Sequence, residues 1–296
     1  MVMRVDEMPR PGNTILCPDY DLFPGGKGAN QAAAAALTGH PTYLFGSLGK
    51  DIFAQKIKDS LVLSGVDISY VSERDSATGC ATICVDSKGE NMIVVASGAN
   101  RKTYAADVPE SLLTSQTTLL SQCEVPCSEV WRIIARAKEK GARTILNLAP
   151  ACKVPEETLH HLDYLIMNEI EVTILALHLG FQEISPTLAA QKITRTYNVV
   201  CVVTLGGGGS FAASLEAEWQ IPALPVDVID TTAAGDVFSG TFAGRLDEGD
   251  TLEGALKYAA AASGLACTKL GAQTSLPTSE EIEAALPKLE SLQKVR

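Results

Sequence analysis

The sequence predicts an α/β protein whose mainly parallel central sheet is covered by helices on both faces. Three observations lead to this fold class. Short apolar runs rich in β-formers alternate with helical segments for most of the chain, several helices end at a glycine, and one β-hairpin interrupts the alternation. Strands that alternate with helices form parallel sheets, which need a helical layer on each face. The chain has 296 residues, 46% of them hydrophobic, which is enough for a large core.

The alternation defines the expected elements in order. Strands are expected at residues 43–47, 117–123, 144–148, 164–167 and 199–204, and helices at residues 29–38, 52–64, 128–140, 169–177 and 186–197. Gly39, Gly65 and Gly141 follow three of these helices as C-terminal stops. Ser185 and Pro186 supply an N-cap and a proline at the first helical position.

The hairpin is expected at residues 78–85 and 91–96, joined by the tight turn at residues 86–89. In a parallel protein such a hairpin indicates an inserted lid or an oligomer interface. The C-terminal third returns to helices, at residues 234–246 and 251–268. The second of these is rich in small residues that allow close packing. A last helix begins with a capping box from Thr278 to Glu281.

Composition excludes several classes of function. Lys and Arg number 24 against 35 Asp and Glu, which gives a net charge of −11. Bulk charge therefore disfavours nucleic acid and anionic membranes as partners. No run approaches the roughly 20 apolar residues of a membrane span, and the N-terminal residues lack the apolar stretch of a signal peptide. We expect a cytoplasmic protein.

The cysteines are expected to be free thiols. Their spacing contains no CxxC pair, and the four histidines form no ligand pattern with them. Small buried thiols in a reducing compartment are therefore favoured over a metal site or disulfides. The eight positions are Cys17, Cys80, Cys84, Cys123, Cys127, Cys152, Cys201 and Cys267.

The segment 230–236, Asp-Thr-Thr-Ala-Ala-Gly-Asp, opens a helix and contains the strongest signal for chemistry. Small residues before a helix let backbone N–H groups approach an anion, and the helix dipole adds a favourable field. An aspartate in such a turn fits if Asp236 accepts a proton from a hydroxyl that attacks a phosphate. A simple helix N-cap is the competing interpretation.

A glycine-rich segment at residues 24–30, Pro-Gly-Gly-Lys-Gly-Ala-Asn, also precedes a helix. Its glycine spacing differs from that of a Walker loop, and no Ser or Thr follows the lysine. Lys27 and Asn30 are placed to hydrogen-bond a hydroxylated ligand. The alternative is a turn with an exposed lysine.

A third glycine cluster follows the apolar strand that ends at Thr204. Gly207, Gly209 and Ala212 satisfy the spacing of the dinucleotide fingerprint, but that fingerprint requires a helix to follow. The sequence after Ser210 indicates extended chain. A loop that passes close to a nucleotide is therefore favoured over a dinucleotide site.

Two strand ends carry further polar residues. Asn168, Glu169 and Glu171 open a helix, where the carboxylates either stabilise the helix dipole or hold a hydrated Mg²⁺. Asn147 ends another strand, at the edge where α/β sheets bind ligands.

Taken in this order, the segments resemble the ribokinase-like (phosphofructokinase B) carbohydrate kinases, from about Arg4 to the C-terminal helix. The resemblance implies an enzyme that transfers the γ-phosphoryl group of ATP to the primary hydroxyl of a sugar, D-ribose in the first place, to form ribose 5-phosphate. Asp236 would be the base, and Ala233, Ala234 and Gly235 would form the anion hole. The implied sugar-binding residues are Gly26, Lys27, Gly28, Ala29, Asn30, Glu124 and Asp236.

The resemblance also implies the remaining ligands. ATP would contact Asn168, Thr204, Leu205, Gly206, Gly207, Gly208, Gly209, Gly235 and Asp236. Glu171 would support Mg²⁺ through water. A monovalent cation, usually potassium, would lie near Asp230, Thr232, Ala266, Lys269, Gly271 and Ser275, several of them through backbone carbonyls.

The resemblance divides the chain into two regions. Residues 22–76 and 98–296 would form the α/β kinase domain, and residues 1–21 and 77–97 a β lid that also forms a homodimer interface. The family's first strand, which ends in sugar-binding residues, would precede residue 1. We expect a truncated sequence, and a catalytically weak sugar-binding homologue is the alternative.

Other substrates within the family, and one other class of enzyme, stay open at this stage. Within the family, 2-keto-3-deoxygluconate, fructose and nucleosides are the rival substrates. A dinucleotide-dependent oxidoreductase would rest only on the spacing from Gly207 to Ala212.

Overall fold

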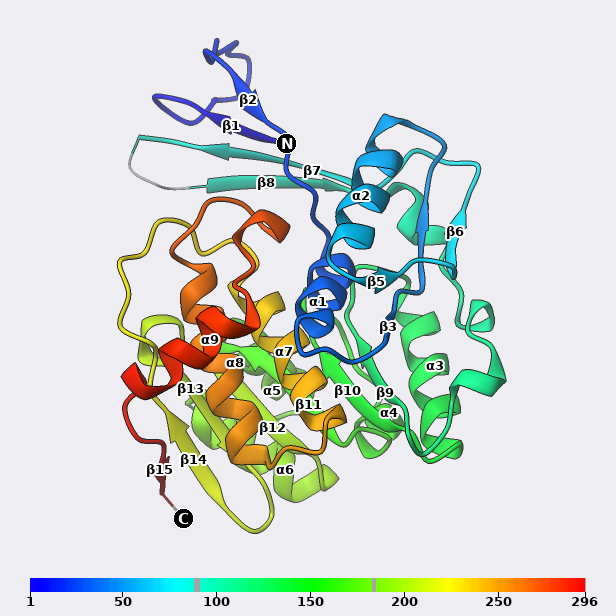
Figure 1. Ribbon diagram of the computed structural model, residues 1–296, viewed down its shortest axis with the longest axis vertical. Helices are drawn as coiled ribbons and strands as arrows, with labels where there is room; N and C mark the ends of the chain where they lie inside the picture. The colour runs from blue at the N-terminus through cyan, green and yellow to red at the C-terminus, as the bar shows by residue number, and fades with distance from the viewer. Residues whose placement is uncertain (88–90, 183–184, 296) are drawn as a thin grey trace.

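The computed structural model describes residues 1–87, 91–182 and 185–295. A large sheet lies between layers of helices, and a smaller sheet stands apart from it at the top of the view in Figure 1. The α/β fold class predicted from the sequence is confirmed. None of the described helices is long and apolar enough to cross a membrane.

The main sheet has seven strands within the described residues, in the order β15-β14-β13-β12-β11-β10-β9. The strands from β9 to β12 are parallel, whereas β12 to β15 are antiparallel. The sheet is therefore mixed, and the predicted parallel arrangement holds only for strands β9 to β12. Their bounds are β9 Thr118–Ser121, β10 Arg143–Asn147, β11 Tyr164–Asn168, β12 Val200–Thr204, β13 Ser210–Ala213, β14 Glu218–Ile221 and β15 Gln293–Lys294.

The helices cover both faces of this sheet. They are α1 Lys27–Ala36, α2 Ile52–Leu63, α3 Cys127–Glu139, α4 Glu156–His160, α5 Glu169–His178, α6 Pro186–Tyr197, α7 Ala234–Asp247, α8 Leu252–Ala266 and α9 Ser279–Ala285. Successive residues of one strand point to opposite faces. Leu165 of β11 accordingly packs with α3, α5 and α6, whereas its neighbour Ile166 packs with α7 and α8.

The helix ends follow the sequence signals closely. Ser185 is the N-cap of α6, directly before Pro186, and its side chain accepts a hydrogen bond from the Leu188 N–H. The capping box between Thr278 and Glu281 is present at α9. Asn198, with φ of 55°, ends α6 in the left-handed region and was not anticipated.

The expected strand at residues 43–47 is divided into two short strands. β3 Thr42–Tyr43 pairs with β5 Val66–Asp67, and β4 Gly46–Leu48 pairs with β6 Val71–Glu73. A turn in the partner segment, closed by a hydrogen bond from the Val71 N–H to the Ile68 carbonyl at 2.9 Å, interrupts the pairing. These pairs are separate from the main sheet.

The smaller sheet contains the predicted hairpin. Its order within the described residues is β2-β1-β7-β8, with bounds β1 Val2–Arg4, β2 Tyr20–Asp21, β7 Cys80–Val85 and β8 Asn91–Ala96. β1 and β7 are parallel, and the other pairs are antiparallel. The predicted turn at residues 86–89 lies partly outside the described residues.

Candidate active site

Helix α1 packs closely against α7 (Figure 1). This packing brings together the segments at residues 24–30 and 230–236, from which the two helices begin. A Cβ at Gly240 would lie 2.3 Å from the Gln31 carbonyl oxygen, and a Cβ at Gly244 would lie 2.3 Å from the Thr38 hydroxyl oxygen. Ala33 and Ala34 are fully buried on α1. Small residues therefore let two helix backbones approach, which sets the N-terminus of α1 beside that of α7.

Asp236 lies in the first turn of α7 and is buried, with 6% of its surface exposed. Its Oδ2 accepts a hydrogen bond from Asn30 Nδ2 at 2.8 Å, and its Oδ1 accepts one from Gln31 Nε2 at 3.0 Å. The two donors are consecutive residues of α1. The structure therefore joins the two segments that the sequence singled out separately.

Burial raises the pKa of Asp236 above its ordinary value of 3.8, because the charged form is desolvated. The Lys27 charge and the hydrogen bonds from Asn30 and Gln31 act in the opposite direction without cancelling that effect. A carboxylate with a raised pKa takes up a proton more readily than an exposed aspartate. Asp236 therefore has the environment of a general base.

Sequence reasoning missed the glutamines that support this carboxylate. Gln31 Nε2 also donates to Asn147 Oδ1 at 2.9 Å, and Gln31 Oε1 accepts from Gln122 Nε2 at 2.7 Å. Gln273 Nε2 contacts Asn30 Oδ1 at 3.4 Å. A glutamine inside the alanine run of α1 was the available signal, because a polar side chain on a buried helix face needs a partner.

The glycine-rich segment at residues 24–30 forms the start of α1. Gly26, with φ of 98°, is the N-cap residue, and the Lys27 N–H donates to Glu124 Oε2 at 2.9 Å. Glu124 lies in the loop that joins β9 to α3. The segment and Glu124 line a cavity of about 970 Å³ together with Asp236 and with Ile83 of β7.

The N-terminus of α7 opens toward solvent. Ala233 has left-handed backbone angles, with φ of 62°, and no side chain among the described residues caps this helix. A Cβ built at Gly235 meets no described heavy atom within 4 Å. The Ala234 N–H contacts the Thr231 carbonyl at 3.2 Å. An uncapped helix start with open space above it fits an anion.

The third glycine cluster connects two strands. Asn168 and Thr204 are paired in register at the carboxyl ends of β11 and β12. Gly206–Gly208 form one short turn, and a Cβ at Gly209 would lie 2.0 Å from the Ile221 carbonyl oxygen. Strand β13 follows this loop, so the helix that a dinucleotide fingerprint requires is replaced by a strand. The dinucleotide interpretation fails on this geometry.

Glu171 and Asn168 cap α5 reciprocally. The Asn168 N–H donates to Glu171 Oε2, and the Glu171 N–H donates to Asn168 Oδ1, both at 2.8 Å. Burial raises the pKa of Glu171, opposed by the Asn168 hydrogen bond and by Lys27, and Asp236 acts to raise it further. The carboxylate is thus part of the same charged neighbourhood as Asp236. Its oxygens are of the hard type that Mg²⁺ prefers.

The segment predicted to bind a monovalent cation contains Asp230, whose carboxylate accepts hydrogen bonds from the Thr232 and Gly271 N–H groups at 2.9 Å each. Burial opposes ionisation, yet these hydrogen bonds prevail and lower the pKa of Asp230. The Lys269 ammonium pairs with Glu281, so only the backbone carbonyl of Lys269 is suited to a cation.

The predicted residues divide into two groups by position. Those that line the 970 Å³ cavity are Gly26, Lys27, Gly28, Ala29, Asn30, Glu124, Asp230, Thr232, Ala233, Asp236 and Gly271. The other residues predicted for ATP and metals are not in its lining: Ala234, Gly235, Asn168, Glu171, Thr204, Leu205, Gly206, Gly207, Gly208, Gly209, Ala266, Lys269 and Ser275. In the second group, Asn168, Glu171 and residues 204–209 lie at or just after the ends of β11 and β12, and Ala234 and Gly235 begin α7. Ala266, Lys269 and Ser275 lie at the end of α8 and in the segment that follows it.

Comparison with known proteins agrees with this geometry. The sequence pattern of the pfkB family carbohydrate kinases matches residues 1–279. The ribokinase of Lactococcus lactis is 34% identical over 98% of this chain and 94% of its own. A deoxyribokinase of Salmonella typhimurium is 30% identical over 97% of this chain and 95% of its own.

Solved structures give the same result. Ribokinase from Thermotoga maritima superposes with a TM-score of 0.89 at 32% identity, covering 97% of this chain and 95% of that one. Ribokinase from Arabidopsis thaliana, complexed with ribose and ATP, has a TM-score of 0.85 at 31% identity, with 96% and 94% covered. The chain therefore belongs to the pfkB family of carbohydrate kinases, and it is a carbohydrate kinase.

Proposed function

We propose that this kinase transfers the γ-phosphoryl group of ATP to the primary hydroxyl of D-ribose and forms ribose 5-phosphate. The observation that supports this most directly is the buried Asp236 carboxylate, held by Asn30 and Gln31 at the open start of α7. The relatives named above are mostly ribokinases, and one of them was solved with ribose and ATP.

In the proposed reaction, Asp236 takes the proton of the sugar hydroxyl as that oxygen attacks the γ-phosphorus. The bond from this phosphorus to the β–γ bridging oxygen breaks, and ADP leaves. The start of α7, around Ala233, Ala234 and Gly235, has no side-chain cap, and its backbone N–H groups would stabilise the charge that develops on the transferred group. Catalysis rests on positioning and electrostatics, as in other phosphoryl transfers.

The nucleotide would lie along residues 204–209, with Asn168 beside its phosphates. Asn168 and Thr204 are neighbours in register, so one ligand can contact both strand ends. Glu171 would hold Mg²⁺ through water, and the ion would neutralise phosphate charge when bound. Asp230, Thr232 and Gly271 would form the monovalent cation site with the carbonyls of Ala266 and Lys269 and with Ser275.

The sugar would lie between residues 26–30 and Glu124, beneath the small sheet. We assign residues 22–76 and 98–296 to the kinase domain, and residues 1–21 and 77–97 to the lid. Ile83 and Ile93 of the lid strands line the same cavity as Asp236.

The lid would also form a homodimer interface. On β8, Ile93 lines the cavity, and the next residue, Val94, is 64% exposed on the opposite face. A strand with apolar residues on both faces is normally covered on both. A second copy of the chain would cover the outer one.

An ADP-release assay over several acceptors tests the proposed function. Ribose should give the highest kcat/KM, above deoxyribose, fructose, 2-keto-3-deoxygluconate and a nucleoside, and K⁺ should raise the rate. Deoxyribose is the second candidate, because a deoxyribokinase is among the similar proteins. Preference for another acceptor would replace ribose. Absence of turnover with all five, while a sugar still binds by calorimetry, would favour the sugar-binding homologue.

A further inference from the structure

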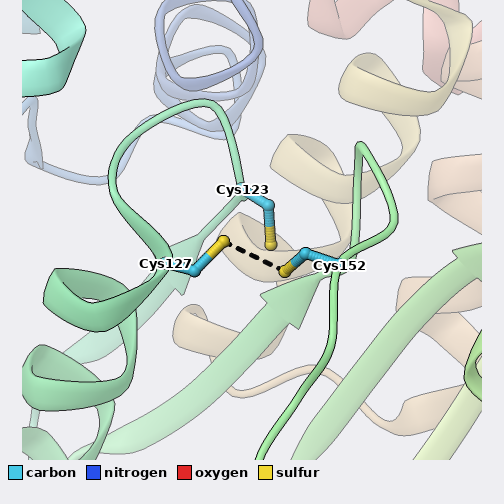
Figure 2. A group of neighbouring side chains, drawn as sticks. All are labelled: Cys123, Cys127 and Cys152. Carbon is cyan, nitrogen blue, oxygen red and sulfur yellow. Dashed lines mark hydrogen bonds between the residues drawn. The ribbon is translucent and has the colours of Figure 1, made fainter. Parts of the chain in front are cut away.

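Three cysteines from two segments of the chain meet beside the β9–α3 loop, which carries Glu124. Cys123 follows β9, Cys127 is the first residue of α3, and Cys152 lies in the loop after β10. Their three sulfur atoms all lie within 4.8 Å of one another. Figure 2 shows the three side chains pointing toward a common centre, with Cys127 Sγ donating to Cys152 Sγ at 3.1 Å.

We propose that Cys123, Cys127 and Cys152 form a binding site for a soft, thiophilic metal ion held by three thiolates. A metal–sulfur bond of about 2.3 Å places three ligand sulfurs roughly 4 Å apart. The observed separations, from 3.1 Å to at most 4.8 Å, bracket that value. Side-chain adjustments of less than 1 Å would therefore complete the site.

The chemistry of the cluster favours a soft ion over a hard one. Its donor atoms are all sulfur, and soft thiolates select Cu(I) and Zn(II) over Mg²⁺ or Ca²⁺. The surroundings are apolar, since Cys123 belongs to the core and Val125 and Trp131 pack against it. Cys127 and Cys152 are only half-buried, which leaves an entry path and room for a water ligand.

Binding would release the thiol protons of the cluster, because metal ions bind the thiolate form of cysteine.

The site would fix the loop that carries Glu124. This residue lies between Cys123 and Cys127, and its Oε2 accepts the Lys27 N–H at 2.9 Å. A bound ion would tie both ends of the β9–α3 loop to the β10 loop. An effect on sugar KM follows only if the proposed function is correct, whereas metal binding itself does not depend on it.

The test is an anaerobic titration of the reduced, purified protein with Zn²⁺ and, separately, with Cu(I), each in competition with a colorimetric chelator. One of the two ions should bind at one equivalent per chain, and that arm identifies the metal. Cys127→Ser and Cys152→Ser should each weaken binding at least 10–100-fold, the loss typical of weaker second-shell changes. Cys80→Ser, outside the cluster on β7, should bind as the wild type does.

A mapping experiment on the wild type removes any dependence on variant folding. A saturating amount of the bound metal should protect Cys127 and Cys152 from iodoacetamide, while Cys17 and Cys80 stay reactive, as read by peptide mass spectrometry. Equal alkylation of Cys127 and Cys152 with and without metal would overturn the proposal. Failure of both ions to bind, or full binding in the Cys123/Cys127/Cys152 triple serine variant, would also overturn it.

Discussion

The side-chain amide of Asn30 donates a hydrogen bond to the Asp236 carboxylate at 2.8 Å, although 206 positions separate the two residues in sequence. This contact joins the residue predicted to bind sugar to the residue predicted to remove a proton from it. Both lie in the first turns of helices that pack directly against each other. The proposed substrate hydroxyl and its base are thus positioned by one structural unit.

Asp236→Asn should lower kcat by about 10²–10⁴-fold, because the amide cannot accept the hydroxyl proton. The folded protein should persist, since an amide of the same shape fits the buried position. Steady-state kinetics and far-ultraviolet circular dichroism measure the two effects. Asp227→Asn, at an exposed position, is the matched control. An Asp236→Asn enzyme of nearly wild-type kcat would rule out this base.

The pH dependence of stability should report the raised pKa of Asp236. A carboxyl whose folded pKa lies above its unfolded value near 3.8 stabilises the fold fully below that value, and this contribution is lost as pH rises through the folded pKa. The Asp236→Asn variant has no carboxyl at this position, so it does not lose this contribution. The free energy of unfolding of the variant should therefore increase relative to that of the wild type as pH rises from about 4. A constant difference would contradict the raised pKa.

Gln31→Ala should shift the acid limb of kcat/KM to higher pH. The substitution removes a hydrogen bond to the Asp236 carboxylate, so its pKa should rise further. The free energy of unfolding should fall by about 1–3 kcal/mol, because the buried Asn147 side chain and the partly buried Gln122 side chain each lose a partner. Gln55→Ala, on the exposed face of α2, should change neither quantity. Loss of stability without a pH shift would give Gln31 a structural role only.

Gly235→Ala and Gly240→Ala should separate activity from stability. A methyl at Gly235 meets open space and improves helix propensity by up to about 1 kcal/mol, but it intrudes where an anion is expected. This variant should be stable and have a raised KM for ATP or a reduced kcat. A methyl at Gly240 meets the Gln31 carbonyl at 2.3 Å and should cost about 1–3 kcal/mol. Thermal unfolding and kinetics check both, and a fully active Gly235→Ala enzyme would argue against the anion hole.

Glu171→Gln should raise the Mg²⁺ concentration needed for half-maximal activity. Glutamine can still accept the Asn168 N–H, so the cap of α5 should survive while the charge that attracts the cation is lost. Glu169→Gln changes an exposed carboxylate in the same turn and serves as the control. Identical Mg²⁺ curves for both variants would exclude Glu171 from the metal site.

Val94→Lys should convert the proposed dimer to a monomer in size-exclusion chromatography with light scattering. The side chain is exposed on the outer face of β8, so a lysine there is tolerated in the monomer and costly in an apolar interface. Leu215→Lys, an exposed residue outside the lid, should leave the mass unchanged. A wild-type protein that is already monomeric at micromolar concentration would refute the interface.

Local signals in the sequence were sufficient for most of the fold. Proline and serine at the start of α6, and the Thr278 capping box, act within a few residues and were recognised correctly. The division of the strand at residues 43–47 could not be recognised, because it depends on a turn more than 20 residues away. The antiparallel direction of β13, β14 and β15 was not predicted for a similar reason, because strand direction depends on which strands pair in the folded sheet.

The candidate site shows the same division. Asp236 and the residues around Asn30 were predicted as site residues because their segments are unusual in themselves. Gln122 and Gln273 were missed, since their importance lies only in contacts with Gln31 and Asn30. Cys152 is a comparable case, because only the folded chain brings it to Cys127.

The glycine contacts between α1 and α7 have a consequence for how this enzyme can change its substrate. A Cβ at Gly240 would collide with the Gln31 carbonyl oxygen, so the backbone of α1 limits how far a larger residue at this position could be accommodated. At Gly244 the close neighbour is the Thr38 side chain, just beyond the end of α1. The β1, β7 and β8 strands of the smaller sheet and the loop around Glu124 contain no glycine in such a contact. In the proposed reaction, new acceptor specificities would therefore arise by exchanging residues in those surrounding segments, while the spacing between α1 and the proposed base on α7 stays unchanged.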